Sequence, residues 1–156
     1  MKVIKPPQSI VSGDRLNWSI FLAGSIEMGT AENWQDKVEK HFEGNPFYTI
    51  LNPRRDDWDS SWEQEFENPQ FYQQVSWELN ALDKATHILM YFSPETKSPI
   101  SLLELGLYAK SEKMVVVCPE GFWRRGNVEI VCEKYGIPFY SDLDEALKRF
   151  FSKNTL

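Results

Sequence analysis

The most restrictive feature of this sequence is a regular alternation of short apolar runs with segments of helical spacing. Five apolar runs of strand length occupy residues 18–23, 47–51, 87–92, 114–118 and 137–140. Helical patterns fill the intervals at residues 31–43, 69–84, 98–110 and 127–136, and another covers residues 142–151. A strand–helix–strand order of this kind predicts parallel strands joined by helical crossovers.

The apolar runs contain few polar positions, which is typical of strands that are covered on both faces. We therefore expect an α/β fold: a single doubly wound, mainly parallel five-stranded sheet with helices on both faces, flavodoxin-like or Rossmann-like. The length of 156 residues suits one domain with a full core. Residues 18–156 are predicted to form this domain, and the polar residues 1–17 to form an N-terminal arm laid on it.

Three of the predicted strands are followed by polar or glycine-containing loops, "GSIEMG", "NPRR" and "SPETKSP". In open parallel sheets, ligands bind outside the carboxyl ends of the strands. Backbone N–H groups at Gly24 and Ser25 could hold phosphate or sugar oxygens, although a tight connection would look the same. Asn52 and Arg54 are candidate ligand contacts in the second loop, since arginine pairs well with phosphate or carboxylate. For Arg55, a salt bridge to the acidic residues that follow is favoured.

Glu104 is a single carboxylate inside the otherwise apolar helical run "SPISLLELGLYAK" at residues 98–110. The N-terminus of this predicted helix faces the carboxyl edge of the sheet. Free N–H groups and the helix dipole favour a carboxylate there, so we expect Glu104 to be ionised at neutral pH. An ionised carboxylate in a partly dry cleft is a good nucleophile toward a carbon that develops positive charge, such as C1′ of a sugar. The alternative is a glutamate that only hydrogen-bonds the backbone or pairs with a basic residue.

Glu78 lies one position off an apolar stripe in the helix predicted at residues 69–84. The stripe consists of Phe71, Val75, Leu79 and Leu82, whose helical spacing predicts a core-facing side. A carboxyl at the boundary of a core can have its pKa raised by desolvation, which suits a proton donor to a leaving group. An ordinary solvated carboxylate is the alternative.

The composition excludes several classes of function. The net charge of −6, with no basic run, argues against binding to polymeric nucleic acid, whereas a single nucleoside or nucleotide needs only a local site. No His/Cys/Asp cluster has zinc spacing, so no metal site is expected. Cys118 and Cys132 are expected to be buried thiols. No apolar run approaches the roughly 18 residues of a membrane span, and no signal peptide is evident, so we expect a cytoplasmic protein without a membrane partner.

An acidic insert between the second strand and the next helix contains Trp58, Trp62 and Phe66. These rings could stack on a base as a lid, or fill a core or a subunit interface.

Four sequence blocks follow one another over most of residues 21–129. They are "FLAGSI" (residues 21–26), "WELNALDKATHILMYFSP" (77–94), "SPISLLELGLYA" (98–109) and "GNVE" (126–129). Their order and spacing resemble the nucleoside 2-deoxyribosyltransferase family, including its deoxynucleoside 5′-monophosphate N-glycosidase relatives. The N-terminal arm and the last strand and helix add little to this resemblance.

The resemblance implies that Glu104 is the nucleophile that attacks C1′, releases the base and forms a covalent deoxyribosyl-enzyme, with net retention. Glu78 falls where the family has an aspartate that handles the proton on the base. Asn127 matches an asparagine that the family contributes from a neighbouring subunit, which implies a homo-oligomer with shared active sites. Ser98 stands where the transferases usually have an aspartate that holds the 5′-hydroxyl. A serine at this position resembles the pattern of the monophosphate-cleaving relatives. Phe21 stands where the family has a tyrosine that contacts the nucleophile.

The leading hypothesis is therefore an enzyme that passes deoxyribose from a 2′-deoxynucleoside to another nucleobase. Its partners would be a nucleoside or nucleotide and a free nucleobase, and it would need no metal or redox cofactor because a carboxylate ester carries the sugar. Three alternatives remain: a hydrolytic 5′-monophosphate N-glycosidase, a non-catalytic nucleotide-binding module, and an interaction protein that uses the aromatic insert.

Overall fold

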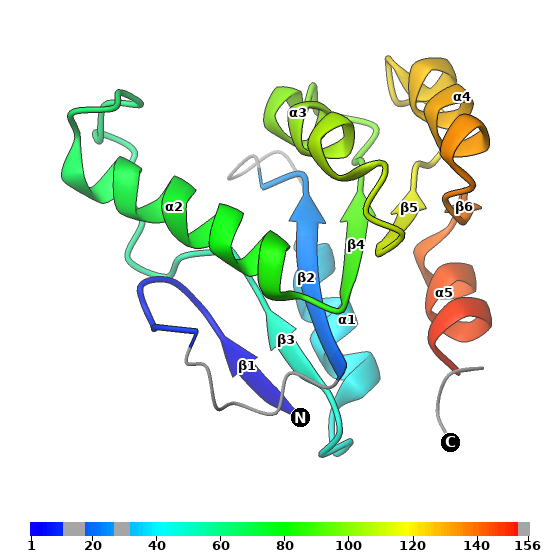
Figure 1. Cartoon of the computed structure of the whole chain (residues 1–156), viewed down its shortest axis with the longest axis horizontal. Coiled ribbons are helices and arrows are strands. Elements are labelled where there is room, and N and C mark those ends of the chain that lie inside the picture. Colours follow the sequence, from blue (N-terminus) through cyan, green and yellow to red (C-terminus); the bar gives the residue numbers. More distant parts are fainter. Residues whose placement is uncertain (11–17, 27–31, 153–156) are drawn as a thin grey trace.

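The computed structural model describes residues 1–10, 18–26 and 32–152, which form a six-stranded parallel sheet between two helical layers (Figure 1). The strand order is β1-β3-β2-β4-β5-β6, and every neighbouring pair is parallel. The strands are β1 (Lys2–Ile4), β2 (Ser19–Gly24), β3 (Thr49–Leu51), β4 (His87–Tyr91), β5 (Met114–Val117) and β6 (Phe139–Tyr140). The expected doubly wound α/β fold is confirmed, and the order of the last five strands is that of flavodoxin-like sheets.

Successive residues of the central strands face opposite helical layers, because side chains alternate along a strand. On one face, Phe21 and Ala23 of β2 belong to a core cluster that also contains residues of α2, α3 and α4. On the other face, Ile20 and Leu22 belong to a second cluster with residues of α1 and α5. The helices are α1 (Trp34–Phe42), α2 (Pro69–Lys84), α3 (Pro99–Tyr108), α4 (Arg125–Tyr135) and α5 (Leu143–Ala146), which continues into a π-helical turn at Leu147–Phe151. Across the described parts of the chain, no helix is both long and apolar enough to cross a bilayer.

The sixth strand, β1, was not among the five expected from the sequence. It lies in the segment predicted as an arm and pairs with β3 at one edge of the sheet. The segment is held further by the Trp77 indole, whose Nε1 donates to the Gln8 carbonyl at 2.7 Å. Only Ile4 of the three strand residues is fully buried. An edge strand this short has too few buried positions to produce a readable apolar pattern.

The apolar stripe of α2 does not face the core as predicted. Leu82 is buried, but Val75 and Leu79 are 36% and 41% exposed, and the buried side of the helix is instead formed with Trp77 and Ala81. The bounds of α2 agree with the sequence, because Asn68 accepts hydrogen bonds from the first-turn N–H groups and Pro69 begins the helix. The helix is thus placed as expected but rotated about its axis relative to the predicted core face.

The chain reverses its direction of winding between β2 and β4. From β2 it passes through α1 to β3 on one side, and it then crosses through α2 to β4 on the other. Gly24 ends β2 at this point with φ +135°, and a Cβ atom there would lie 2.1 Å from the Tyr91 carbonyl oxygen of β4. Ligands bind open α/β sheets at such a switch point, outside the carboxyl ends of the strands.

Candidate functional site

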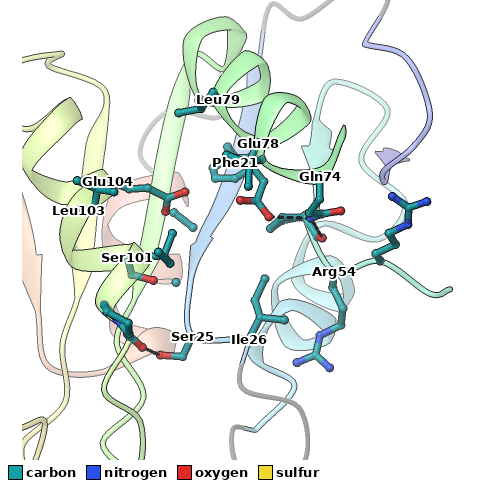
Figure 2. Close-up of a pocket in the computed structure, with 18 of the residues that line it drawn as sticks. Phe21, Ser25, Ile26, Arg54, Gln74, Glu78, Leu79, Ser101, Leu103 and Glu104 are labelled. Atoms are coloured by element: carbon teal, nitrogen blue, oxygen red, sulfur yellow. Dashed lines mark hydrogen bonds between the residues drawn. The ribbon is translucent and has the colours of Figure 1, made fainter. Parts of the chain in front are cut away.

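A cavity of about 690 Å³ opens at this carboxyl edge, between α2 and α3 (Figure 2). Seven of the nine side chains predicted to form a site line it, and Asn52 and Asn127 do not. The seven are Phe21, Gly24, Ser25, Arg54, Glu78, Ser98 and Glu104. They come from four separate parts of the chain, so the fold brings together what the sequence holds far apart.

Glu104 projects into the cavity from α3 and is only 7% exposed. Leu105, its neighbour in sequence, turns to the core, while Ser101, one turn earlier, lines the cavity beside Glu104. Burial, with the nearby charge of Glu78 as a smaller cause, raises the pKa of Glu104 to about 8. The expectation that the helix N-terminus keeps Glu104 ionised at neutral pH is therefore wrong. Glu104 lies in the second turn of α3, beyond the free N–H groups, and desolvation outweighs the helix dipole there.

Glu78 faces Glu104 across the cavity from α2, and Figure 2 shows the two carboxyl groups directed toward the same space. Burial raises the pKa of Glu78 as well, and a hydrogen bond from Gln74 to its Oε1 at 2.7 Å opposes that rise. Each of the two carboxyls is therefore easier to protonate than a solvent-exposed glutamate. Two neighbouring carboxyls with shifted pKa values are a common arrangement for acid and base chemistry.

Three buried hydroxyls form a triangle at the floor of the site, between the ends of β2 and β4 and the start of α3. Ser25 Oγ lies 2.6 Å from Ser98 Oγ and 2.8 Å from Thr96 Oγ1, and the last two oxygens are 2.7 Å apart. The Ser93 N–H donates to Ser25 Oγ at 2.9 Å, and the Thr96 hydroxyl donates to the Ser93 carbonyl at 3.0 Å. The triangle fixes the positions of Ser25 and Ser98 beside the cavity.

Ser98 adopts a left-handed conformation, with φ 46° and ψ 53°, and it precedes Pro99 at the start of α3. Because its hydroxyl belongs to the triangle, its side chain does not cap the helix. The N-terminal end of α3 therefore meets the cavity through backbone and serine groups rather than through a capping carboxylate.

The loop after β3 holds the arginine side of the site. Arg54 lines the cavity and is half-buried. Asn52 lies outside the lining and shapes this loop: its Oδ1 accepts the Arg54 N–H at 2.9 Å, and its Nδ2 donates to Glu39 Oε1 at 2.6 Å. The salt bridge expected for Arg55 is present, with Nε 2.7 Å from Asp57 Oδ1.

The two remaining predicted residues, Phe21 and Asn127, lie beneath the cavity and away from it, respectively. Phe21 is fully buried under the cavity and packs against Trp77, with ring centroids 6.4 Å apart. Asn127 is exposed on α4, away from the lining of this chain's cavity. In the aromatic insert, Trp58 lines the cavity and packs edge-to-face against Trp62, while Phe66 is exposed.

Sequence reasoning missed Gln74, Thr96 and Ser101. Gln74 lies four residues before Glu78, and Ser101 three residues before Glu104, so each shares a helix face with a candidate carboxylate. Helical spacing relative to the two glutamates would have identified both. Thr96 had no such signal, because it reaches the site only through the path of the loop after β4.

Comparison with known proteins identifies a family for this chain. No curated protein matches the chain. A family model described as nucleoside 2-deoxyribosyltransferase like matches residues 17–122, a range that contains Glu78, Ser98 and Glu104 and ends before Asn127. This match spans well over half of the sequence and runs from β2 to the loop before α4. The chain thus belongs to the nucleoside 2-deoxyribosyltransferase-like family.

Proposed function

We propose that the protein cleaves the N-glycosidic bond of 2′-deoxynucleosides through a covalent glutamyl-deoxyribose intermediate and transfers the sugar to another nucleobase. The observation that carries the proposal is the pair Glu104 and Glu78, which face one another across a cavity of about 690 Å³ in a member of this family. That volume is within the range of small-molecule sites.

In the first half of the reaction, an oxygen of Glu104 attacks C1′ while the bond from C1′ to the base nitrogen breaks. The electron pair of that bond leaves with the base, and Glu78 supplies the proton that neutralises it. The product is a glutamyl ester of deoxyribose, reached through an oxocarbenium-like transition state. Among the described residues, no group hydrogen-bonds the Glu104 carboxylate, so its oxygens are available for attack.

In the second half, a nitrogen of the acceptor base attacks C1′ and displaces Glu104. Glu78, now ionised, takes the proton from the acceptor. Two displacements at the same carbon give net retention. The ester carries the sugar throughout, so the proposed chemistry requires no metal or redox cofactor.

When the base departs, Glu78 must carry a proton and Glu104 must carry the negative charge. Positive charge that develops at C1′ stabilises the Glu104 anion, and this interaction is strong because the Glu104 side chain is buried. The raised pKa of Glu104 shows that its charged form is poorly stabilised without substrate. We infer that its negative charge is stabilised mainly in the transition state, by the positive charge at C1′.

The remaining residues fit the binding of a nucleoside or nucleotide. The hydroxyls of Ser25 and Ser98 and the side chain of Arg54 supply polar contacts, and Phe21 and Gly24 complete the wall. Asn52 acts on this site through the loop that holds Arg54.

We also propose that the protein is a homo-oligomer with shared sites. Apolar side chains rim the cavity, and they are exposed in the single chain. They are Val75, Leu79, Ile100, Leu103 and Leu107. A second copy over this rim would exclude water, which favours transfer over hydrolysis. Asn127, which is exposed away from this chain's cavity, would serve a neighbouring subunit.

One observation favours hydrolysis of a 5′-monophosphate as a second candidate. Ser98 and Ser25 present neutral hydroxyl groups to the cavity, where an aspartate would repel a phosphate. Arg54 lines the same cavity and suits a phosphate partner.

The test is chromatography of each 2′-deoxynucleoside and its 5′-monophosphate after incubation with the protein, with and without adenine or cytosine as acceptor. A new deoxynucleoside that requires the acceptor would establish transfer. Free base formed regardless of acceptor would establish the N-glycosidase instead.

Glu104→Ala, run beside the wild type, should lose at least about a hundredfold in rate, because it removes the covalent nucleophile. Near-normal turnover by this variant would refute the mechanism. Tight nucleotide binding without base release by the wild type would identify a binding module.

A further inference from the structure

Gln74 occupies a position on α2 one turn before Glu78 and is 6% exposed on the wall of the cavity. Its Nε2 donates two hydrogen bonds, one to the Pro53 carbonyl at 2.9 Å and one to Glu78 Oε1 at 2.7 Å (Figure 2). The side chain thus ties the carboxyl of Glu78 to the backbone of the loop that follows β3.

The orientation of the Gln74 amide follows from its two partners. The Pro53 carbonyl is an acceptor only, so it requires an N–H donor, and a reversed amide would set oxygen against oxygen. Both N–H groups of Gln74 are therefore used. Its Oε1 is buried and has no hydrogen-bond partner among the described residues.

A buried carbonyl oxygen without a partner costs stability. A methionine or leucine would fill the same wall of an apolar cavity without that cost. The amide instead supplies a donor that holds the carboxyl of Glu78.

We propose that Gln74 is the positioning residue that fixes which oxygen of Glu78 exchanges a proton with the nucleobase. The inference rests on the proposed function. Oε1 accepts a hydrogen bond from the Gln74 N–H at 2.7 Å. Protonation of Oε1 would weaken it as an acceptor and bring its proton close to the Gln74 hydrogen, so Oε2 is the favoured site for the proton. The proton of the neutral carboxyl therefore resides on Oε2.

Each half of the reaction then uses the same oxygen. As the bond between C1′ and the base nitrogen breaks and Glu104 bonds to C1′, the Oε2 proton passes to the base. In the reverse direction, Oε2 takes the proton of the acceptor base. The hydrogen bond from Gln74 persists in both states and stabilises the carboxylate that the first half produces.

The test is Gln74→Met, which conserves volume and removes both donors. Base release is compared for 2′-deoxyguanosine and 7-methyl-2′-deoxyguanosine, whose cationic base leaves without a proton. We expect Gln74→Met to lose about tenfold or more in kcat on the first substrate, and less than about threefold on the second.

The pH profile of kcat/KM with the best deoxynucleoside substrate is a second readout. Without the Gln74 donor, the carboxylate form of Glu78 is less stabilised, so the alkaline limb should move to higher pH. A purely structural role would lower the rate without moving that limb. This profile decides the question if the wild type accepts no guanine nucleoside.

Gln70→Met is the matched control, since Gln70 is exposed on the same helix one turn earlier, and it should leave both readouts unchanged. Gln74→Ser, which removes bulk without strain, should reproduce the selective loss if Gln74→Met folds poorly. An equal loss on both guanine substrates, with an unmoved alkaline limb, would overturn the positioning role while leaving the proposed function intact. A wild type that releases no base would overturn both.

Discussion

The two cavity glutamates show how burial and position on a helix combine to set an ionisation state. Glu104 is surrounded by aliphatic side chains and faces Glu78, and both features disfavour its charged form. The N-terminus of α3 is too far away to compensate. Burying Glu104 in the cavity therefore has a cost to folding once the carboxyl is ionised, which a mutation can measure.

Glu104→Gln should stabilise the protein at alkaline pH. Glu104 keeps its proton in the folded state up to about pH 8, whereas its ordinary value of 4.5 applies when unfolded. The penalty is absent below pH 4.5, grows as the pH rises, and is complete above 8. We expect Glu104→Gln to be more stable than wild type by a few kcal/mol at about pH 8.5 and nearly equal at about pH 4.5, since each pKa unit is worth about 1.4 kcal/mol.

Urea unfolding at the two pH values provides the measurement. Glu133→Gln, at an exposed position on α4, is the control and should change the free energy of unfolding little at either pH. A difference between Glu104→Gln and wild type that is the same at both pH values would contradict the assignment.

The junction of β2 and β4 depends on the absence of a side chain at residue 24. Gly24 has φ +135°, and its missing Cβ would lie 2.1 Å from the Tyr91 carbonyl oxygen. The Ser25 N–H donates to that same oxygen at 3.0 Å, and Ser25 in turn leads into the hydroxyl triangle. The close approach of β2 and β4 therefore positions Ser25 and the hydroxyl triangle at the floor of the site.

Gly24→Ala should lower the free energy of unfolding by at least about 2–3 kcal/mol, because it combines an unfavourable φ with a backbone clash. Gly44→Ala separates the two causes, since Gly44 has φ +78° but a Cβ atom added there would have no neighbour within 4 Å, and it should cost only about 1 kcal/mol. Denaturant unfolding of both variants measures the difference. Equal costs would show that the contact with Tyr91 relaxes without penalty.

The α2 helix shows which parts of this structure the sequence could predict. Its ends follow from Asn68, Pro69 and the length of the pattern, which are local signals. Its orientation does not, because Val75 and Leu79 are apolar whether they face a core or the wall of a cavity. Hydrophobic spacing detects a surface that avoids water and does not show what covers it.

The same distinction holds for the site and the sheet. Glu104 stood out because it interrupts a local apolar pattern, Ser98 was identified only through the family resemblance, and β3, β4 and β5 were predictable because they are continuous apolar runs. β1 and Thr96 were not, since each is defined by tertiary contacts: β1 by pairing with β3, and Thr96 by its hydrogen bonds to Ser25 and Ser98.

The mouth of the cavity is rimmed by exposed apolar side chains. Leu103 of α3 is 59% exposed beside the cavity mouth, and four other apolar side chains share that rim. Exposed apolar side chains grouped in this way are typical of interaction sites. Since this rim surrounds the carboxyl pair, a copy of the chain that covered it would also close the site to water.

We therefore expect the 18.3 kDa chain to have the mass of an oligomer by sedimentation, and Leu103→Lys to reduce that mass to one chain by placing a charge in the interface. Phe47→Lys is the matched control, because Phe47 is 69% exposed just before β3 and does not line the cavity. It should remain oligomeric. Sugar transfer by Leu103→Lys should fall relative to hydrolysis, since an uncovered cavity admits water to the glutamyl ester. A monomeric wild type, or an oligomeric Leu103→Lys with an unchanged ratio of transfer to hydrolysis, would show that the rim serves another purpose.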